Sequence, residues 1–260
     1  MSGRIRVEKE GAIGWIVFDH PERRNAISRA MWDAIPAATE ELARNPDVRV
    51  GILRGEGDVA FVSGADISEF QEQRSGDGAM AYEERNASAF QALAEFPKPL
   101  IAMIHGFCVG GGLALVIHAD LRLAADDGTF AVPAGRLGLG YPAGSLRALV
   151  RLVGPAIAKD LFFTARRFGS EEALRLGLLN EVVAKPQLEA RTREIAGRIA
   201  ENAPLTLRAA KRVIEDYGRD PDQRDPDAVH AAIRDCFVSE DYQEGIRAFL
   251  EKRAPRFQGR

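Results

Sequence analysis

The first part of the chain alternates between short apolar runs and longer amphipathic stretches. Residues 13–18 (IGWIVF) form an apolar run that predicts a buried strand, ended by His20 and Pro21. Residues 29–44 have helical period, and Ser28 stands where an N-cap would accept a hydrogen bond. Residues 48–54 alternate as a strand does. This succession of strands and helices predicts an α/β core.

The same pattern continues further along the chain. We expect residues 60–66 to form a loop and residues 67–95 to be a polar helical stretch with a break near Gly76 and Gly78. Apolar runs predict further strands at 99–104, 121–125 and 129–132, and an apolar helical segment at 113–118.

Beyond residue 187 the alternation gives way to helical period alone. Pro204, Pro221 and Pro226 separate the segments. We therefore divide the chain into an α/β core, residues 1–186, and a helical region, residues 187–260, packed on the core or on a neighbouring subunit. The predicted helices are 189–200, 205–217, 228–238 and 242–252.

Composition narrows the classes of function. The chain has 260 residues, 46% of them hydrophobic, which suits a substantial folded core. A net charge of −3 gives no reason to expect nucleic acid or an anionic membrane as a partner. No apolar run approaches membrane-spanning length. Cys108 and Cys236 are far apart and form no CxxC pair, so we expect no metal site, and we expect a cytoplasmic protein.

Two glycine-containing segments are the candidates for chemistry, because each precedes a helical segment. They are residues 63–66 (SGAD) and 106–112 (GFCVGGG). Backbone N–H groups at helix starts are unpaired, and two of them converging on one point would form an oxyanion hole. The alternative is that the glycines only permit tight turns and close packing. From the residues alone, both interpretations stay open.

Competing motifs are weaker. The chain contains no GxxxxGK[ST] phosphate loop and no GxSxG nucleophile elbow. Residues 138–143 match the loose GxGxxA dinucleotide pattern, but no clear apolar strand precedes them and Pro142 lies inside.

Taken together, several segments resemble the enoyl-CoA hydratase/isomerase, or crotonase, superfamily. The resemblance covers nearly the whole chain, and the paired GADI and GGG segments are its most specific part. The matching segments are 24–26 (RNA), 63–67 (SGADI), 99–112 (PLIAMIHGFCVGGG), 120–124, 137–139, 163–165, 173–183 and 244–253.

The resemblance implies a fold and a ligand. The fold would be a crotonase-like α/β spiral of stacked ββα turns with a C-terminal helical trimerisation region, assembled as a homotrimer or homohexamer. The ligand would be an acyl-CoA thioester, with coenzyme A as part of the substrate and no separate cofactor. The backbone N–H groups of Ala65 and Gly111 would form the oxyanion hole.

Further site residues follow from the same resemblance. Residues 65–68 would line the acyl thioester, Arg23 and Arg24 would contact the nucleotide end of CoA, and Phe249 and Lys252 would approach CoA from the C-terminal helix. The implied substrate-binding set is Arg23, Arg24, Ala26, Ala65, Asp66, Ile67, Ser68, Gly111, Ala114, Ala134, Phe249 and Lys252.

The chain departs from the family pattern at two positions. Hydratases of the family carry two glutamates that handle the proton and the water, and these positions are Ala114 and Ala134 here. We expect a lyase of the enoyl-CoA hydratase type by similarity, although alanine cannot transfer a proton. Two alternatives stay open, a decarboxylase of a malonyl-type CoA ester and a CoA-ester-binding protein with little catalysis.

Tyr141 is the leading catalytic candidate in this region, because its hydroxyl can donate or accept a hydrogen bond. Methylmalonyl-CoA decarboxylases of the superfamily carry a tyrosine in the same loop and resemble this chain at 239–245 and 248–253. They have a histidine where this chain has Ala65, so the similarity is partial. The alternative for Tyr141 is a packed aromatic ring whose hydroxyl is satisfied.

Overall fold

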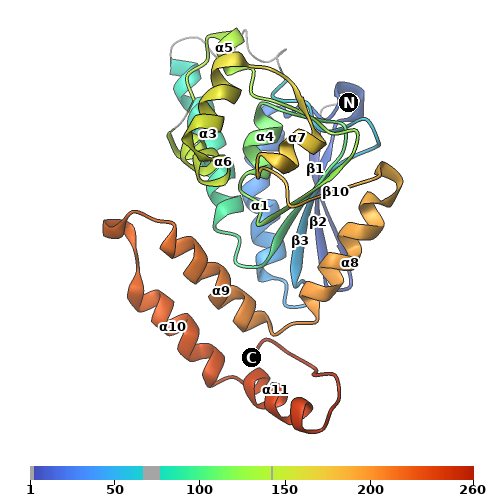
Figure 1. Ribbon diagram of the computed structural model, residues 1–260, viewed down its shortest axis with the longest axis vertical. Coiled ribbons are helices and arrows are strands. Elements are labelled where there is room, and N and C mark those ends of the chain that lie inside the picture. The colour runs from blue at the N-terminus through green and yellow to red at the C-terminus, as the bar shows by residue number, and fades with distance from the viewer. Residues whose placement is uncertain (1–2, 67–76, 142) are drawn as a thin grey trace.

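The computed structural model describes residues 3–66, 77–141 and 143–260, and its described strands form a six-stranded and a four-stranded sheet (Figure 1). The larger sheet has the order β1-β2-β3-β5-β7-β10 and is parallel except for the β1–β2 pair. Its strands are β1 (Arg4–Glu10), β2 (Ile13–Asp19), β3 (Val50–Gly55), β5 (Leu100–Ile104), β7 (Leu121–Ala125) and β10 (Glu181–Val183).

The smaller sheet has the order β4-β6-β8-β9, with β4, β6 and β8 parallel. Its strands are β4 (Ala60–Val62), β6 (Phe107–Val109), β8 (Thr129–Ala131) and β9 (Phe168–Gly169). The helices of the core are α1 (Arg29–Arg44), α3 (Asp77–Ala94), α4 (Gly111–Val116), α5 (Ala134–Leu137), α6 (Ala143–Thr164) and α7 (Ser170–Arg175), with a 3₁₀ turn η1 (Pro21–Arg23).

Both faces of the larger sheet are buried, because alternate side chains of its central strands enter different clusters. Ile16 and Phe18 of β2 pack in the cluster that contains α1, α3 and α4. Trp15 and Val17 point to the other face, where α8 (Leu188–Ala200) covers them. Figure 1 shows α1 and α8 on opposite sides of the strands. This explains why the apolar run of residues 13–18 is continuous rather than alternating.

The N-terminus of α1 forms as its sequence predicts. The Ser28 side chain accepts a hydrogen bond from the Met31 N–H at 3.4 Å, and the helix runs from Arg29 to Arg44. Its buried face includes Met31, Trp32, Ile35 and Leu42, which recur at helical spacing.

The C-terminal region is an arm of helices that leaves the core below α8 (Figure 1). Few of its residues are buried in the chain: Ala209 in α9 and Ala248 in α11 are the apolar ones. Large apolar side chains are instead exposed, among them Ile214, Phe237 and Phe249. The elements of this arm are α9 (Pro204–Tyr217), η4 (Pro221–Gln223), α10 (Pro226–Phe237) and α11 (Glu240–Leu250), and the turn η3 (Lys185–Gln187) precedes α8.

The structure confirms the predicted α/β fold and corrects one segment. Residues 60–66 were expected to be a loop, but Ala60–Val62 is strand β4, buried and paired with β6. Three apolar residues are too few to show a strand period, and the partner strand lies more than forty residues away in the sequence. Helix α3 begins at Asp77, and residues 67–76 lie outside the described residues. The division at residues 186 and 187 stays a prediction.

No helix in the described part of the chain is both long enough and apolar enough to cross a lipid bilayer.

Candidate functional site

The candidate site lies where three parallel strands of the smaller sheet end. β4, β6 and β8 are neighbours, so their carboxyl ends meet at one edge of the sheet. Ala65 follows β4, Gly111 follows β6 and Ala134 follows β8. Ligands of α/β proteins commonly bind at such an edge, because the chain there forms loops and helix starts rather than strand pairs.

The segment that carries Ala65 is held in place by an extended bridge. Ile27 and Ala65 form an isolated parallel bridge, in which the Ile27 N–H donates to Gly64 O and the Asp66 N–H donates to Ile27 O. These two bonds use the peptide groups on either side of Ala65 and leave its own N–H pointing away from the bridge.

Asn25 fixes the other side of that bridge, a role that the sequence did not reveal. Asn25 is 1% exposed, and its side chain accepts from His20 N–H and donates to the carbonyls of Glu56 and Ala60 at 2.9 and 2.8 Å. Arg24 and Asn25 both have positive φ, which asparagine tolerates better than most residues. The only hint of this role in the sequence is that Asn25 stands close to a turn that contains a proline.

The three consecutive glycines at the start of α4 have different roles. Gly110 has φ +54°, a conformation that favours glycine, and Gly111 is the first residue of α4. A Cβ on Gly112 would lie 2.4 Å from Val62 O, whereas a Cβ on Gly111 would have Trp32 as its nearest neighbour, 3.2 Å away. Gly112 is therefore the residue that lets α4 pack directly on β4.

We expect Gly112→Ala to destabilise the protein by about 1–3 kcal/mol, because the new methyl group must displace the β4 backbone. Gly111→Ala is the matched control, since it adds the same methyl group to the same helical turn against a side chain instead of backbone. Urea unfolding of both variants measures the difference. Equal free energies of unfolding would contradict the close approach of α4 to Val62.

Ala65 and Gly111, the residues that carry the two expected N–H donors, lie close together. A Cβ on Gly111 would lie 3.7 Å from the Ala65 nitrogen. Gly111 is at the N-terminus of α4, where the first intrahelical bond runs from Ala114 N–H to Gly110 O and so does not use the Gly111 N–H. Neither N–H group has a hydrogen-bond acceptor among the described residues. Two such donors can hold one oxygen atom between them.

Aromatic residues form a wall beside these donors, and the sequence did not point to them. Trp32 of α1 lies against Gly111, and its ring meets Phe90 edge-on with 5.5 Å between centroids. Phe90 in turn stacks on His118 at 5.2 Å. Burial lowers the pKa of His118 to about 4, so its imidazole is neutral near pH 7. The wall is therefore uncharged.

The two alanines at the expected glutamate positions are buried. Ala114 lies in α4 and is 3% exposed, and Ala134 begins α5 and is 4% exposed. Neither side chain can ionise, so these two positions supply no proton donor or acceptor.

Tyr141 lies after α5 and packs against the main core cluster. Its ring meets Phe162 of α6 edge-on, with 4.9 Å between centroids. Tyr141 as a whole is half-buried.

The residues expected to contact the nucleotide end of CoA, Arg23 and Arg24, lie just before Ile27 in the sequence, next to the Ile27–Ala65 bridge. Arg23 and Arg24 are exposed; Arg23 Nη1 is 4.0 Å from Asp66 Oδ1, and the Arg24 guanidinium lies over the Phe107 ring at 5.1 Å. Ala26 is buried beside them, and its carbonyl oxygen is 2.9 Å from the His20 ring nitrogen Nδ1. Ile67 and Ser68 lie outside the described residues.

Phe249 and Lys252 are far from Ala65 and Gly111 within the same chain. Phe249 is 84% exposed on α11, and Lys252 follows that helix with φ +55°. Figure 1 shows α11 at the opposite end of the molecule from α4. The structure therefore does not bring these two residues to the site of their own chain.

The described residues offer neither a metal cluster nor an activated thiol near the site. Among them no group of three or more His, Cys, Asp or Glu side chains is placed to hold a metal ion. Burial raises the pKa of the Cys108 thiol in β6, which disfavours the nucleophilic thiolate.

Comparisons with family models, curated proteins and solved structures all indicate the same family. The enoyl-CoA hydratase/isomerase family model matches residues 8–260. The short-chain-enoyl-CoA hydratase of Clostridium acetobutylicum is 34% identical over 253 residues, covering 96% of this chain and 95% of that one. The methylmalonyl-CoA decarboxylase of Escherichia coli is 34% identical over 258 residues, covering 98% of each. A solved structure of an enoyl-CoA hydratase/isomerase family protein from Hyphomonas neptunium superimposes with a TM-score of 0.94 at 42% identity, covering 98% of each chain.

Proposed function

The chain belongs to the enoyl-CoA hydratase/isomerase family, and from that premise we propose that it binds an acyl-CoA thioester and polarises its carbonyl with the N–H groups of Ala65 and Gly111. The observation that carries the proposal is the placement of these two unpaired donors, with 3.7 Å between a Gly111 Cβ position and the Ala65 nitrogen. The thioester oxygen would accept both hydrogen bonds. These bonds strengthen as negative charge develops on the oxygen in a thioester enolate.

The rest of the ligand would extend from the donors in two directions. Arg23 and Arg24 are exposed beside the Ala65 segment, where two guanidinium groups can pair with the phosphates of CoA. The acyl chain would lie along Trp32 and Phe90, since this wall is apolar and neutral. Asp66, Ala26, Ile67 and Ser68 belong to the same proposed binding set, with Ala114 and Ala134 beside the acyl carbons.

The reaction we favour is that of a lyase acting through the enolate. Hydration by two glutamates requires carboxylates that Ala114 and Ala134 do not provide. Because only the carbonyl-polarising donors would then assist the reaction, we expect the chain to hydrate crotonyl-CoA slowly.

Decarboxylation of a malonyl-type CoA ester is the second candidate, because it needs no added water. The bond between the α-carbon and the carboxylate breaks, CO₂ leaves, and the electron pair enters the thioester enolate held by Ala65 and Gly111. A proton then adds to the α-carbon. Tyr141 would orient the leaving carboxylate or supply that proton. The relative named methylmalonyl-CoA decarboxylase, matched over 98% of this chain, supports this candidate.

Assembly with further copies would place Phe249 and Lys252 at a site. On α11 they are remote from the donors of their own chain, while large apolar side chains are exposed on α9, α10 and α11. Exposed apolar surface of this kind is typical of protein interfaces. We propose a homotrimer or homohexamer in which α11 of one copy approaches the CoA of another.

A panel of three CoA esters tests the proposed function. Purified protein is offered crotonyl-CoA, methylmalonyl-CoA and a 3-enoyl-CoA, and the products are followed by mass. Binding of all three with turnover of at least one supports an acyl-CoA enzyme. CoA esters that bind without any turnover would favour the alternative of a binding protein. The absence of binding would overturn the proposal.

If methylmalonyl-CoA is decarboxylated, we expect Tyr141→Phe to lower kcat by about tenfold to a hundredfold, because the hydroxyl that assists the carboxylate is lost. The ring and its contact with Phe162 are retained in this variant. Phe162→Leu is the control for packing, since it perturbs the same contact without removing the hydroxyl. Unchanged kcat in Tyr141→Phe would exclude the hydroxyl from the mechanism.

A further inference from the structure

A small cavity lies on the far side of the core from the candidate site, between α9 and the starts of β3 and β5. Its volume is about 180 Å³. The C-terminal tail closes one side with Gln258 and Gly259, and Pro204 and Leu207 of α9 form another. Four segments distant in sequence therefore meet around it: the loop before β3, the loop before β5, the start of α9 with the residues before it, and the last residues of the chain.

The charged side chains that line this cavity are all positive. Arg49, Lys98 and Arg208 line it, and none of the described residues that line it carries a carboxylate. Arg49 Nη2 donates to Phe257 O at 2.5 Å and Nη1 to Ala200 O at 3.3 Å. Lys98 Nζ donates to the carbonyls of Leu42 and Asn45 at 2.8 and 2.6 Å. These contacts orient the cations without neutralising them.

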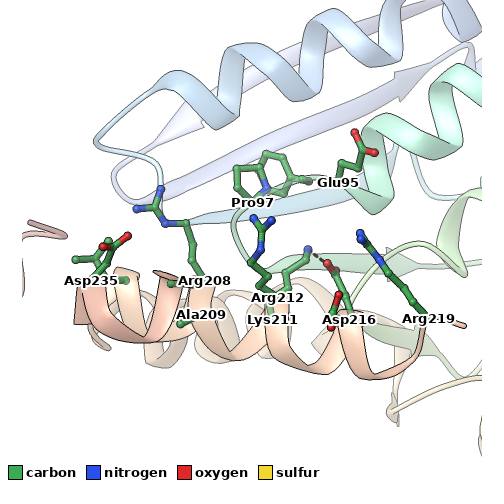
Figure 2. A pocket seen from close by; sticks show the side chains of 13 residues that line it. Glu95, Pro97, Arg208, Ala209, Lys211, Arg212, Asp216, Arg219 and Asp235 are labelled. Atoms are coloured by element: carbon green, nitrogen blue, oxygen red, sulfur yellow. Dashed lines mark ion pairs between the residues drawn. The ribbon is translucent and has the colours of Figure 1, made fainter. Parts of the chain in front are cut away.

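Arg208 is the least satisfied of the three. Its guanidinium has no hydrogen-bond acceptor and no ion pair within the part of the chain that the structure describes. Figure 2 shows its side chain extending from α9 toward the core. The pKa of Lys98 is lowered to about 8, mainly by burial and to a smaller extent by repulsion from Arg208. Like charges held together without a counter-charge favour an anion between them.

A neighbouring cleft, in contrast, is lined by charged side chains of both signs. It is larger, about 540 Å³, and is lined by residues of α9, by Glu95, Phe96 and Pro97, and by Asp235 of α10 (Figure 2). Arg208 lies between the two and lines both the cleft and the smaller cavity. Its lining includes the carboxylates of Glu95, Glu215, Asp216 and Asp235 as well as cations. Lys211 lies 3.9 Å from Glu215 and also pairs with Asp120, outside the cleft, at 2.8 Å. Arg212 reaches Asp225 at 4.0 Å. The lining of the larger cleft thus contains carboxylates, whereas the described lining of the smaller cavity contains none.

We propose that this cavity is a binding site for a phosphate-type oxyanion, held by Arg49, Lys98 and Arg208. A volume of about 180 Å³ is below the roughly 300–1,000 Å³ of pockets for drug-sized ligands, so it suits an ion of a few atoms. Guanidinium groups match the geometry of phosphate oxygens with paired N–H donors, and an ammonium adds a compact charge.

Binding there has a structural consequence. The anion would join α9 and the loops before β3 and β5 at the place where the C-terminal tail returns to the core through Arg49 and Phe257. An anion that binds only the folded chain stabilises it in proportion to its concentration. The site would therefore strengthen the attachment of the C-terminal arm to its own core.

Thermal unfolding in sodium phosphate and in sodium chloride of equal ionic strength tests the proposal. We expect phosphate to raise Tm of the wild-type protein more than chloride does. Arg208→Gln should weaken phosphate binding by about tenfold and remove most of the difference. Arg212→Gln is the matched control, because it removes the same charge one turn further along α9 from outside the cavity. Equal phosphate effects in all three proteins would overturn the proposal, as would a wild type that responds alike to both salts.

A second measurement reports on the cavity itself and stays informative if Arg208→Gln is unstable. Acetylation of Lys98 by an N-hydroxysuccinimide ester is followed by mass spectrometry. Bound phosphate favours the ammonium form, so we expect phosphate, and not chloride, to slow labelling of Lys98 in the wild type. Glycerol 3-phosphate in place of phosphate distinguishes a monoester ligand from the free ion. Labelling of Lys98 that neither compound slows would overturn the proposal.

Discussion

Gly111→Pro is expected to lower kcat/KM for the CoA ester that the protein turns over by about 10²–10³-fold, the effect of removing one oxyanion donor. Proline has no N–H group, so the variant deletes one of the two proposed donors. The backbone tolerates the change: Gly111 is the first residue of α4, a position that proline often occupies, and its N–H has no acceptor among the described residues. Gly110 before it has no Cβ to clash with the proline ring.

The control for this variant is Gly111→Ala. Both changes place a Cβ 3.2 Å from the Trp32 ring, so they share the same crowding, but only the alanine variant keeps the N–H. We expect Gly111→Ala to lose far less kcat/KM than Gly111→Pro at similar melting temperatures. Equal activity of the two variants would remove the Gly111 N–H from the proposed oxyanion hole.

Installing both missing carboxylates should have the second large effect. We expect the double variant Ala114→Glu, Ala134→Glu to hydrate crotonyl-CoA about 100-fold faster than the wild type, the usual order for positioned acid–base groups. The physical reason is that the present side chains cannot move a proton, while the proposed donors for the thioester oxygen remain in place. Initial rates of crotonyl-CoA hydration measure the change.

The matched control is Ala114→Gln, Ala134→Gln, which adds side chains of the same size without a titratable proton. Both positions are buried, so we expect some loss of stability in both double variants, with burial also raising the pKa of the new carboxyl groups. Equal hydration rates in the two double variants would show that proton transfer at these positions does not limit the reaction.

Some features of this protein were determined by the sequence alone, because they depend on neighbours along the chain. The apolar run of residues 13–18, the Ser28 cap and the helix from Arg29 to Arg44 all form as predicted. Local patterns are sufficient here, since a cap acts within one helical turn. The family resemblance likewise points to Ala65 and Gly111 from sequence alone.

Other features could not be predicted, because their partners are remote in the sequence. Three residues at Ala60–Val62 form a strand only because β6 pairs with them. Asn25 shows its role only through carbonyl groups about thirty residues later, and the aromatic wall joins α1, α3 and α4.

The sequence by itself therefore determined the α/β class, the helical C-terminal region and the glycine segments that resemble those of acyl-CoA enzymes. Only the tertiary structure decided that Ala65 and Gly111 lie close together, that Phe249 and Lys252 lie far from them, and that Arg49, Lys98 and Arg208 line one cavity. The physical reason is the same in each case: periodicity and caps are local, whereas a site forms where the sheet and the helices packed on it bring distant segments together.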